Sequence, residues 1–197
     1  QEPASLTRAV HSLGGAVYEG SYFQGAIKSM QIWSRALDAV EVASLYALDG
    51  ACLATPSATP TTASPTATFA PTLAPTPDHM LALDHSLCFD QCALDDQAGG
   101  MHATLMNGAT CTAGEGIIFD GDDDYADLVD QSLGGPMTIA IWARWDALNS
   151  WSRLCDFGDG NGDDDILISN YETSAIISID LYVGSSLKST QGGSIVL

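Results

Sequence analysis

Basic residues are scarce in this sequence. Six lysines and arginines stand against 25 aspartates and glutamates, which gives a formal net charge of -19 at pH 7. Because proteins bind nucleic acids chiefly by neutralising phosphates with lysine and arginine, this balance argues against a nucleic-acid partner. It favours divalent cations, basic partners or a surface whose charge serves solubility. No apolar run approaches the length that crosses a bilayer either, so we expect no membrane span.

The few cysteines accompany a mucin-like segment, and together they favour an oxidising, extracellular setting, secreted or at the cell surface. We expect two disulfides and one leftover thiol, with a pairing that the sequence leaves open. A zinc site is the less favoured alternative, because Cys88 and Cys92 have no second matched pair and no histidine stands at ligand spacing. No N-terminal leader is present, which predicts a processed chain or an excerpt from a longer one. The disulfide candidates are Cys52, Cys88, Cys92, Cys111 and Cys155.

Residues 51–79 form a linker rich in threonine and proline. Its centre, residues 53–78, holds six of the chain's eight prolines, eight threonines and no basic residue. Proline removes a backbone donor and fixes φ, so we expect a semi-rigid polyproline-II spacer that reaches about 80 Å when fully extended. The composition is typical of O-glycosylated stalks, with a bare linker as the alternative. The candidate attachment residues are Thr55, Ser57, Thr59, Thr61, Thr62, Ser64, Thr66, Thr68, Thr72 and Thr76.

The stretches on both sides of the linker predict an all-β fold. Before the linker, the pattern of apolar residues predicts strands at 6–13 and 22–33, and Asp38 with Glu41 predicts a capping-box start for a short helix over about 39–47. After it, residues 80–118 are predicted to be loop-rich, with a hairpin turn at Asn107-Gly108. Short strands divided by Asp/Gly turns are typical of an antiparallel β-sandwich. The strand candidates there are 116–119, 125–129, 137–145, 153–157, 166–170, 175–183 and 194–197.

Two groups of motifs carry a family resemblance. The sequence IFDGDDDYADL at 118–128 is followed by MTIAIW at 137–142. This order resembles the F-D-G-x-D-D-Y-V segment and T-I-x-x-W strand of laminin-G-like, concanavalin-A-like jelly-roll modules, and the turns at 95–100 and 106–108 fit the opening of such modules. Residues 22–46 are similar to the module's ending, an F-x-G-x-I strand, then I-W-x-R-A-L and a short helix. The resemblance implies a jelly-roll sandwich.

The two resemblances stand in inverted order. Residues 1–50 resemble the C-terminal part of a laminin-G-like module and residues 80–197 the N-terminal part, whereas the middle strands are missing. One interpretation is an excerpt from tandem repeats joined by linkers. The other is that the two partial modules complete each other, within a chain or between chains. Completion between chains would make a polymer by strand addition.

An acidic loop is the candidate calcium site. Asp159, Asn161, Asp163 and Asp165 place oxygen side chains at alternate positions, and calcium prefers six to eight hard oxygen ligands. The EF-hand pattern fails because no bidentate glutamate follows. An acidic, solvated loop is the alternative. For the carboxylates at 120 and 122–124, the resemblance implies mainly a structural turn, with metal ligation as the less favoured alternative.

Relatives of the resembled family include glycoside hydrolases, which use two carboxylates about 5 Å apart in their retaining mechanism. No E-x-D-x-E run is present, and no Ser/His/Asp or Cys/His grouping suggests a nucleophile. We therefore expect no enzymatic activity and no catalytic residue.

Aromatic side chains offer a carbohydrate platform instead. The candidates for stacking on sugar rings are Trp142, Trp145, Trp151 and Tyr171. Trp33 and Trp142 lie in strand patterns, where core packing is expected. Trp151 follows Asn149-Ser150 in a predicted loop and is therefore the residue that we expect to bind carbohydrate.

Two functional hypotheses follow. The first is an extracellular structural or adhesive glycoprotein, the repeating subunit of a cell-surface filament or matrix fibre such as a flagellar hair, with copies of itself as partners and covalent glycans on the linker. The second is a calcium-dependent carbohydrate-binding module of a larger secreted protein. A filament subunit is expected to need its neighbours, whereas a lectin module folds alone and binds glycan.

Overall fold

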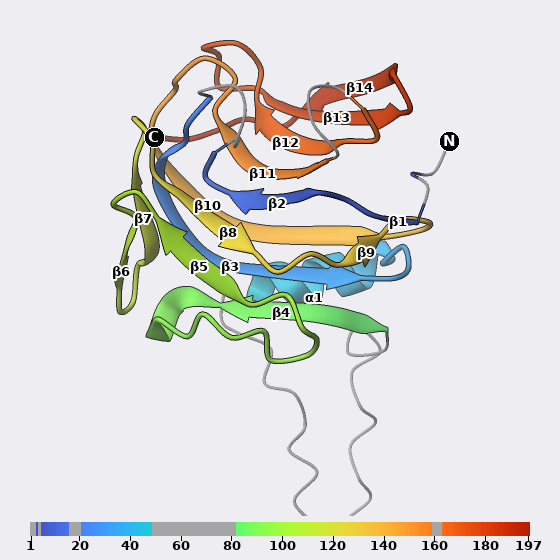
Figure 1. The fold of residues 1–197 in the computed structure, drawn as a ribbon, viewed down its shortest axis with the longest axis horizontal. Coiled ribbons are helices and arrows are strands. Elements are labelled where there is room, and N and C mark those ends of the chain that lie inside the picture. The colour runs from blue at the N-terminus through green and yellow to red at the C-terminus, as the bar shows by residue number, and fades with distance from the viewer. Residues whose placement is uncertain (1–2, 4, 16–20, 49–81, 159–162) are drawn as a thin grey trace, which may run out of the picture.

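The computed structural model describes residues 3, 5–15, 21–48, 82–158 and 163–197. These residues form two antiparallel sheets packed as a sandwich, with one α-helix on the outside (Figure 1). The predicted all-β sandwich is therefore confirmed. The predicted spacer and Cys52 lie outside the described residues.

The larger sheet has seven strands in the order β14-β13-β12-β11-β2-β8-β5. Its first strand in the sequence, β2, lies between β11 and β8, as Figure 1 shows by the blue strand between an orange and a yellow one. Leu13 pairs with Cys155 on one side and with Ala126 on the other. The strand bounds are β2 (Val10–Leu13), β5 (Ala103–Met106), β8 (Tyr125–Leu128), β11 (Arg153–Gly158), β12 (Ile166–Asn170), β13 (Ile177–Val183) and β14 (Ser186–Gly192).

The smaller sheet has five strands arranged around β3 (Gln24–Trp33). One edge of β3 pairs with β10 along its whole length, and the other edge is shared by β4 and β7. A separate pair, β1 (Leu6–Thr7) with β9 (Ser132–Leu133), lies beside the two sheets. The other strands are β4 (Leu83–Cys88), β6 (Thr110–Thr112), β7 (Gly116–Asp120) and β10 (Thr138–Ala147), and a short 3-10 helix, η2 (Phe89–Gln91), follows β4.

Gly25 in the F-x-G-x-I motif allows β3 to occupy this central place. It lies opposite Trp145 of β10 and Phe119 of β7, with φ at +153°. A Cβ at this position would lie 2.0 Å from the carbonyl oxygen of Arg144. The close approach of three strands therefore requires glycine here.

An aromatic cluster fills the core between the sheets. The Phe23 ring, which is fully buried, meets the rings of Trp145 and Phe119 edge-on, with centroids 5.2 and 5.9 Å away. Such edge-to-face pairs are favoured by the ring quadrupoles. Trp33 is fully buried as well, which confirms its predicted place in the core.

The helix α1 (Ala39–Ala47) begins where the capping box predicts it. Asp38 accepts hydrogen bonds from the backbone amides of Val40 and Glu41, while the Glu41 carboxylate accepts from the Asp38 amide. Arg35 donates to both oxygens of Glu41, at 2.8 and 2.5 Å. The helix covers the outer face of the smaller sheet, where Tyr46 meets the ring of Trp142 at 5.7 Å.

Two local predictions were wrong, and a third was incomplete. Residues 82–118 do contain long loops, but they also contain β4, η2, β5 and β6, which were not predicted. Asn107-Gly108 is a turn with positive φ at both residues, but it joins β5 and β6, which belong to different sheets, so it closes no hairpin. Residues 194–197 form no strand; the last strand is β14, whose polar sequence pairs with β13 across a turn at Gly184.

Asp96 is a buried carboxylate that fixes the turn after η2. One oxygen accepts hydrogen bonds from the backbone amides of Ser86 (2.8 Å) and Ala98 (3.0 Å). The other accepts from the Met101 amide (3.0 Å) and lies 2.7 Å from Nδ1 of His85. Burial by itself raises the pKa of Asp96, but these hydrogen bonds outweigh it and hold the pKa well below its ordinary value.

Replacing Asp96 by asparagine is expected to lower the free energy of unfolding by about 2–3 kcal/mol at pH 7, because an amide cannot satisfy the donors on both oxygens. Urea denaturation measures the change. The matched control is Asp95→Asn, whose carboxylate is 92% exposed and whose loss is expected to cost less than about 0.5 kcal/mol.

The same pair of proteins tests the pH dependence. Because the pKa of Asp96 is lower in the folded state, the unfolded chain binds more protons as the pH falls below about 4, and the stability that Asp96 contributes is lost there. The difference between the native protein and Asp96→Asn is therefore expected to shrink from pH 7 to pH 3. A difference that stays constant over this range would contradict the assignment.

Candidate functional site

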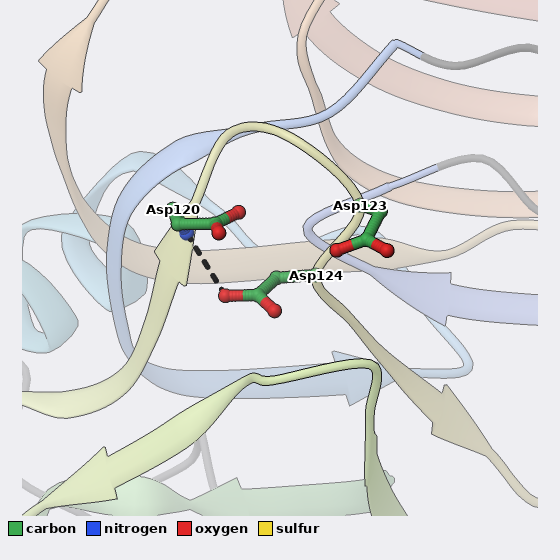
Figure 2. A group of neighbouring side chains, drawn as sticks. All are labelled: Asp120, Asp123 and Asp124. Carbon is green, nitrogen blue, oxygen red and sulfur yellow. Dashed lines mark hydrogen bonds between the residues drawn. The ribbon is translucent and has the colours of Figure 1, made fainter.

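Three carboxylates converge at the turn between β7 and β8. One oxygen from each of Asp120, Asp123 and Asp124 lies within 4.8 Å of the others, and Figure 2 shows the three side chains around the same loop. Asp120 and Asp123 are exposed, whereas Asp124 is buried. Oxygens at this spacing can contribute part of the coordination shell that calcium prefers.

The same aspartates also build the turn. The Asp124 carboxylate accepts a hydrogen bond from the backbone amide of Asp120 at 3.0 Å, and the Asp120 carboxylate accepts one from the amide of Asp122 at 2.8 Å. The side-chain amide of Asn107 donates to the carbonyl of Asp123 at 2.9 Å. The turn that the sequence indicated at this motif is thus present and is held by side-chain to backbone hydrogen bonds.

The surroundings of Asp124 in this turn disfavour the ionised form of its carboxyl group. Burial raises the pKa of Asp124, and the negative charges of Asp120, Asp122 and Asp123 raise it further, against the hydrogen bond from the Asp120 amide. Without a cation, the ionised cluster therefore repels itself.

Asp124→Asn is expected to raise the melting temperature by about 2 °C at pH 7 in chelator, because asparagine keeps an acceptor for the Asp120 amide and removes about 1 kcal/mol of repulsion. Differential scanning calorimetry measures the shift, with Asp95→Asn, an exposed carboxylate outside this turn, as control. Millimolar calcium is then expected to raise the melting temperature of the native protein more than that of Asp124→Asn. A melting temperature below the native value in chelator would contradict this account of the turn.

The predicted calcium loop is only partly described. Asp159 and Asn161 lie outside the described residues, Asp163 is exposed, and Asp165 is 3% exposed. The Asp165 carbonyl accepts a hydrogen bond from the amide of Tyr182. Among the described carboxylates, those that group closely are at 120–124. Calcium binding by the 159–165 loop stays a prediction.

Trp151, the predicted carbohydrate contact, lies in the turn between β10 and β11 with φ at 54°, a left-handed conformation that few non-glycine residues adopt. Its backbone amide donates to the carbonyl of Glu172 at 2.8 Å, and Glu172 itself has φ at 52°. The Trp151 ring meets the ring of Tyr171 edge-on, with centroids 5.0 Å apart and planes at 70°. Two strained turns thus hold one aromatic pair.

The side chain of Asn170 connects these two turns by hydrogen bonds. It is fully buried, and its side-chain oxygen accepts from the backbone amide of Ser152 (2.8 Å) and from the Ser152 hydroxyl (2.7 Å). Its side-chain nitrogen donates to the carbonyls of Asn149 (2.9 Å) and Glu172 (2.6 Å). Neither the spacing nor the composition around Asn170 indicates this role, because the partners meet only when β11 and β12 pair.

The other aromatic candidates are placed elsewhere. Trp145 is 6% exposed and belongs to the core cluster, so it offers no sugar platform. Trp142, expected in the core, is half-buried against Tyr46 of α1 on the outer face of the smaller sheet. Strand alternation explains the difference, because Ile139 and Ile141 take the inward positions of β10.

The described cysteines fit two disulfides and one thiol. Cys92 and Cys111 form a disulfide with a Cα separation of 5.6 Å, and Cys88 is disulfide-bonded as well. Cys155 is free and fully buried, and burial, with a smaller effect of Asp156, raises the pKa of its thiol far above the ordinary value. A buried thiol of this kind is inert.

The ten candidate glycosylation residues lie outside the described residues, as does the spacer that carries them. No helix among the described residues is both long and apolar enough to cross a membrane. No family model, curated protein or solved structure matches the chain. The resemblance to laminin-G-like modules therefore remains a prediction from motifs, on a fold that is a β-sandwich.

Proposed function

We propose that the chain is an extracellular structural or adhesive glycoprotein, the repeating subunit of a cell-surface filament or matrix fibre in which laminin-G-like sandwiches alternate with glycosylated spacers. The observation that carries the proposal is the place of β2 and β3. Both precede the spacer in the sequence, yet each is an interior strand of a sheet whose other strands follow the spacer.

The spacer is much longer than this arrangement needs within one chain. The Ala82 carbonyl accepts a hydrogen bond from the Ser34 amide, so the chain shortly after the spacer lies beside the chain shortly before α1. Since α1 is about 14 Å long, fewer than about ten extended residues would connect its end to β4. Residues 49–81 number several times as many.

A spacer that connects two copies of the chain would use the full length of this segment. A spacer with polyproline-II stiffness resists folding back on itself and instead keeps its ends apart, at up to about 80 Å. If residues 6–48 of one copy complete the sheets formed by residues 82–197 of the next, the same pairing that exists within the sandwich joins the copies into a fibre. Glycans on the spacer would stiffen and shield it.

A cross-strand cysteine pair tests whether the pairing joins copies. Gln31 of β3 and Ala140 of β10 are partners in register, at a Cα separation suited to a disulfide. After oxidation of assembled material, Gln31→Cys/Ala140→Cys is expected to give a ladder of multimers on non-reducing gels. Each single-cysteine variant, which lacks the partner thiol, is the control. Crosslinked monomers alone would contradict exchange between copies.

The spacer glycans are tested by mass spectrometry of the peptide that contains residues 53–78 from native material, together with electron microscopy of that material. We expect regular filaments and added hexose or pentose mass on several threonines or serines. Isolated particles with an unmodified peptide would contradict the structural proposal.

A further inference from the structure

A groove lies over β11 to β14, on the face of the larger sheet opposite the one that packs against the core. It holds about 450 Å³, within the range of small-molecule sites. We call this groove the outer groove. The lining residues that matter here come from β11 to β14 and the two turns around Trp151: Trp151, Arg153, Tyr171, Asp180, Ser189 and Gln191.

Strand register brings the polar residues of the outer groove into rows. Asp180 of β13 lies between Leu167 and Ser189, and Ser178 lies between Ser169 and Gln191. Successive side chains of a strand point to opposite faces of the sheet. Leu167, Ser169 and Asp180 therefore point away from the core, whereas Ile166 and Ile168 pack in it or against it.

These polar groups are nevertheless shielded from solvent. Asp180 is 9% exposed, Ser169 3% and Ser178 not at all, and the Ser178 hydroxyl donates to the Asp180 carboxylate. In small-molecule pockets a few placed polar groups fix the orientation of the ligand, and Asp180 and Ser169 line the groove in this way.

The aromatic end of the outer groove is preorganised. Trp151 and Glu172 both have left-handed backbones, a conformation that is unfavourable for residues other than glycine. The fully buried Asn170 maintains them through four hydrogen bonds. A strained backbone that its surroundings enforce, next to a groove, points to a function that needs the Trp151 and Tyr171 rings in one fixed arrangement.

We propose that the outer groove binds a neutral oligosaccharide. One sugar ring packs its apolar face on the Trp151 ring and meets the Tyr171 ring, which stands at 70° to it, at the side. Its hydroxyls donate to the acceptor-only carboxylate of Asp180 and exchange hydrogen bonds with Ser189 and Gln191, which both donate and accept. The inference stands independently of the assembly proposed above.

The charges of the outer groove select for a neutral ligand. Arg153, its one basic residue, forms an ion pair with Asp156 beside it. Asp180 then leaves the lining with a negative charge, on a chain of net charge -19. Uronic or sulfated sugars would be repelled.

Isothermal titration of the full chain with cellohexaose, xylohexaose and mannohexaose, against hexagalacturonate as the anionic probe, tests the assignment. At least one neutral hexasaccharide is expected to bind at least about tenfold more tightly than hexagalacturonate. No binding of any neutral probe at millimolar concentration, or equal binding of the anionic one, would overturn it.

Variants place the binding in the outer groove. Trp151→Ala is expected to weaken binding about tenfold, and Gln191→Ala, on the exposed edge strand β14, about threefold with an unchanged melting temperature. Trp142→Ala, on the other sheet, is the matched control and should bind like the native protein. Native affinity in both Trp151→Ala and Gln191→Ala, or a loss confined to Trp142→Ala, would overturn the proposal.

Discussion

The sandwich depends on one pairing constraint: β3 must lie between β10 on one edge and β4 with β7 on the other. Without β3, the smaller sheet separates into pieces, and without β2 the larger sheet breaks between β11 and β8. β3 also contributes Ile27 and Met30, both fully buried, to the core. The two parts of the chain that flank the spacer are therefore halves of one folding unit.

This constraint also shapes what the rest of the molecule can do. β11 pairs directly with β2, and β12 to β14 follow it in the same sheet. The turns at 149–152 and 170–174, which join β10 to β11 and β12 to β13, are held in left-handed conformations by the hydrogen bonds of Asn170. The oligosaccharide that we propose for the outer groove would meet rings that are already ordered, which lowers the entropic cost of binding. A fibre subunit and a carbohydrate-binding surface are thus compatible within one sandwich, since they use different faces of it.

The sequence predicts the elements whose signal is local. The capping box at Asp38 and Glu41 locates α1, and the apolar pattern locates β3 and β10. The short strands β4, β5 and β6 were missed, and β14 was misplaced, because their residues are mixed or polar and become strands only when a partner lies beside them.

The residues of the candidate site also differ in how far the sequence predicts them. Trp151 is recognisable as an aromatic residue beside a turn, whereas Asp180 and Gln191 reach the outer groove only through the register of β12, β13 and β14. The fixing role of Asn170 likewise depends on pairing between strands. Register is a property of the folded sheet, and a single sequence does not display it.

The most direct measurement is to cut the spacer and ask whether the two halves stay together. A specific protease site in place of residues 62–66 is cleaved in the folded Cys88→Ala variant, which removes the disulfide at Cys88 as a tether. If β2 and β3 complete the sandwich, the fragments elute together and keep the β-sheet circular dichroism of the uncut protein. If the fragment that contains residues 82–197 elutes alone and remains folded, the account of one sandwich built from two halves is wrong.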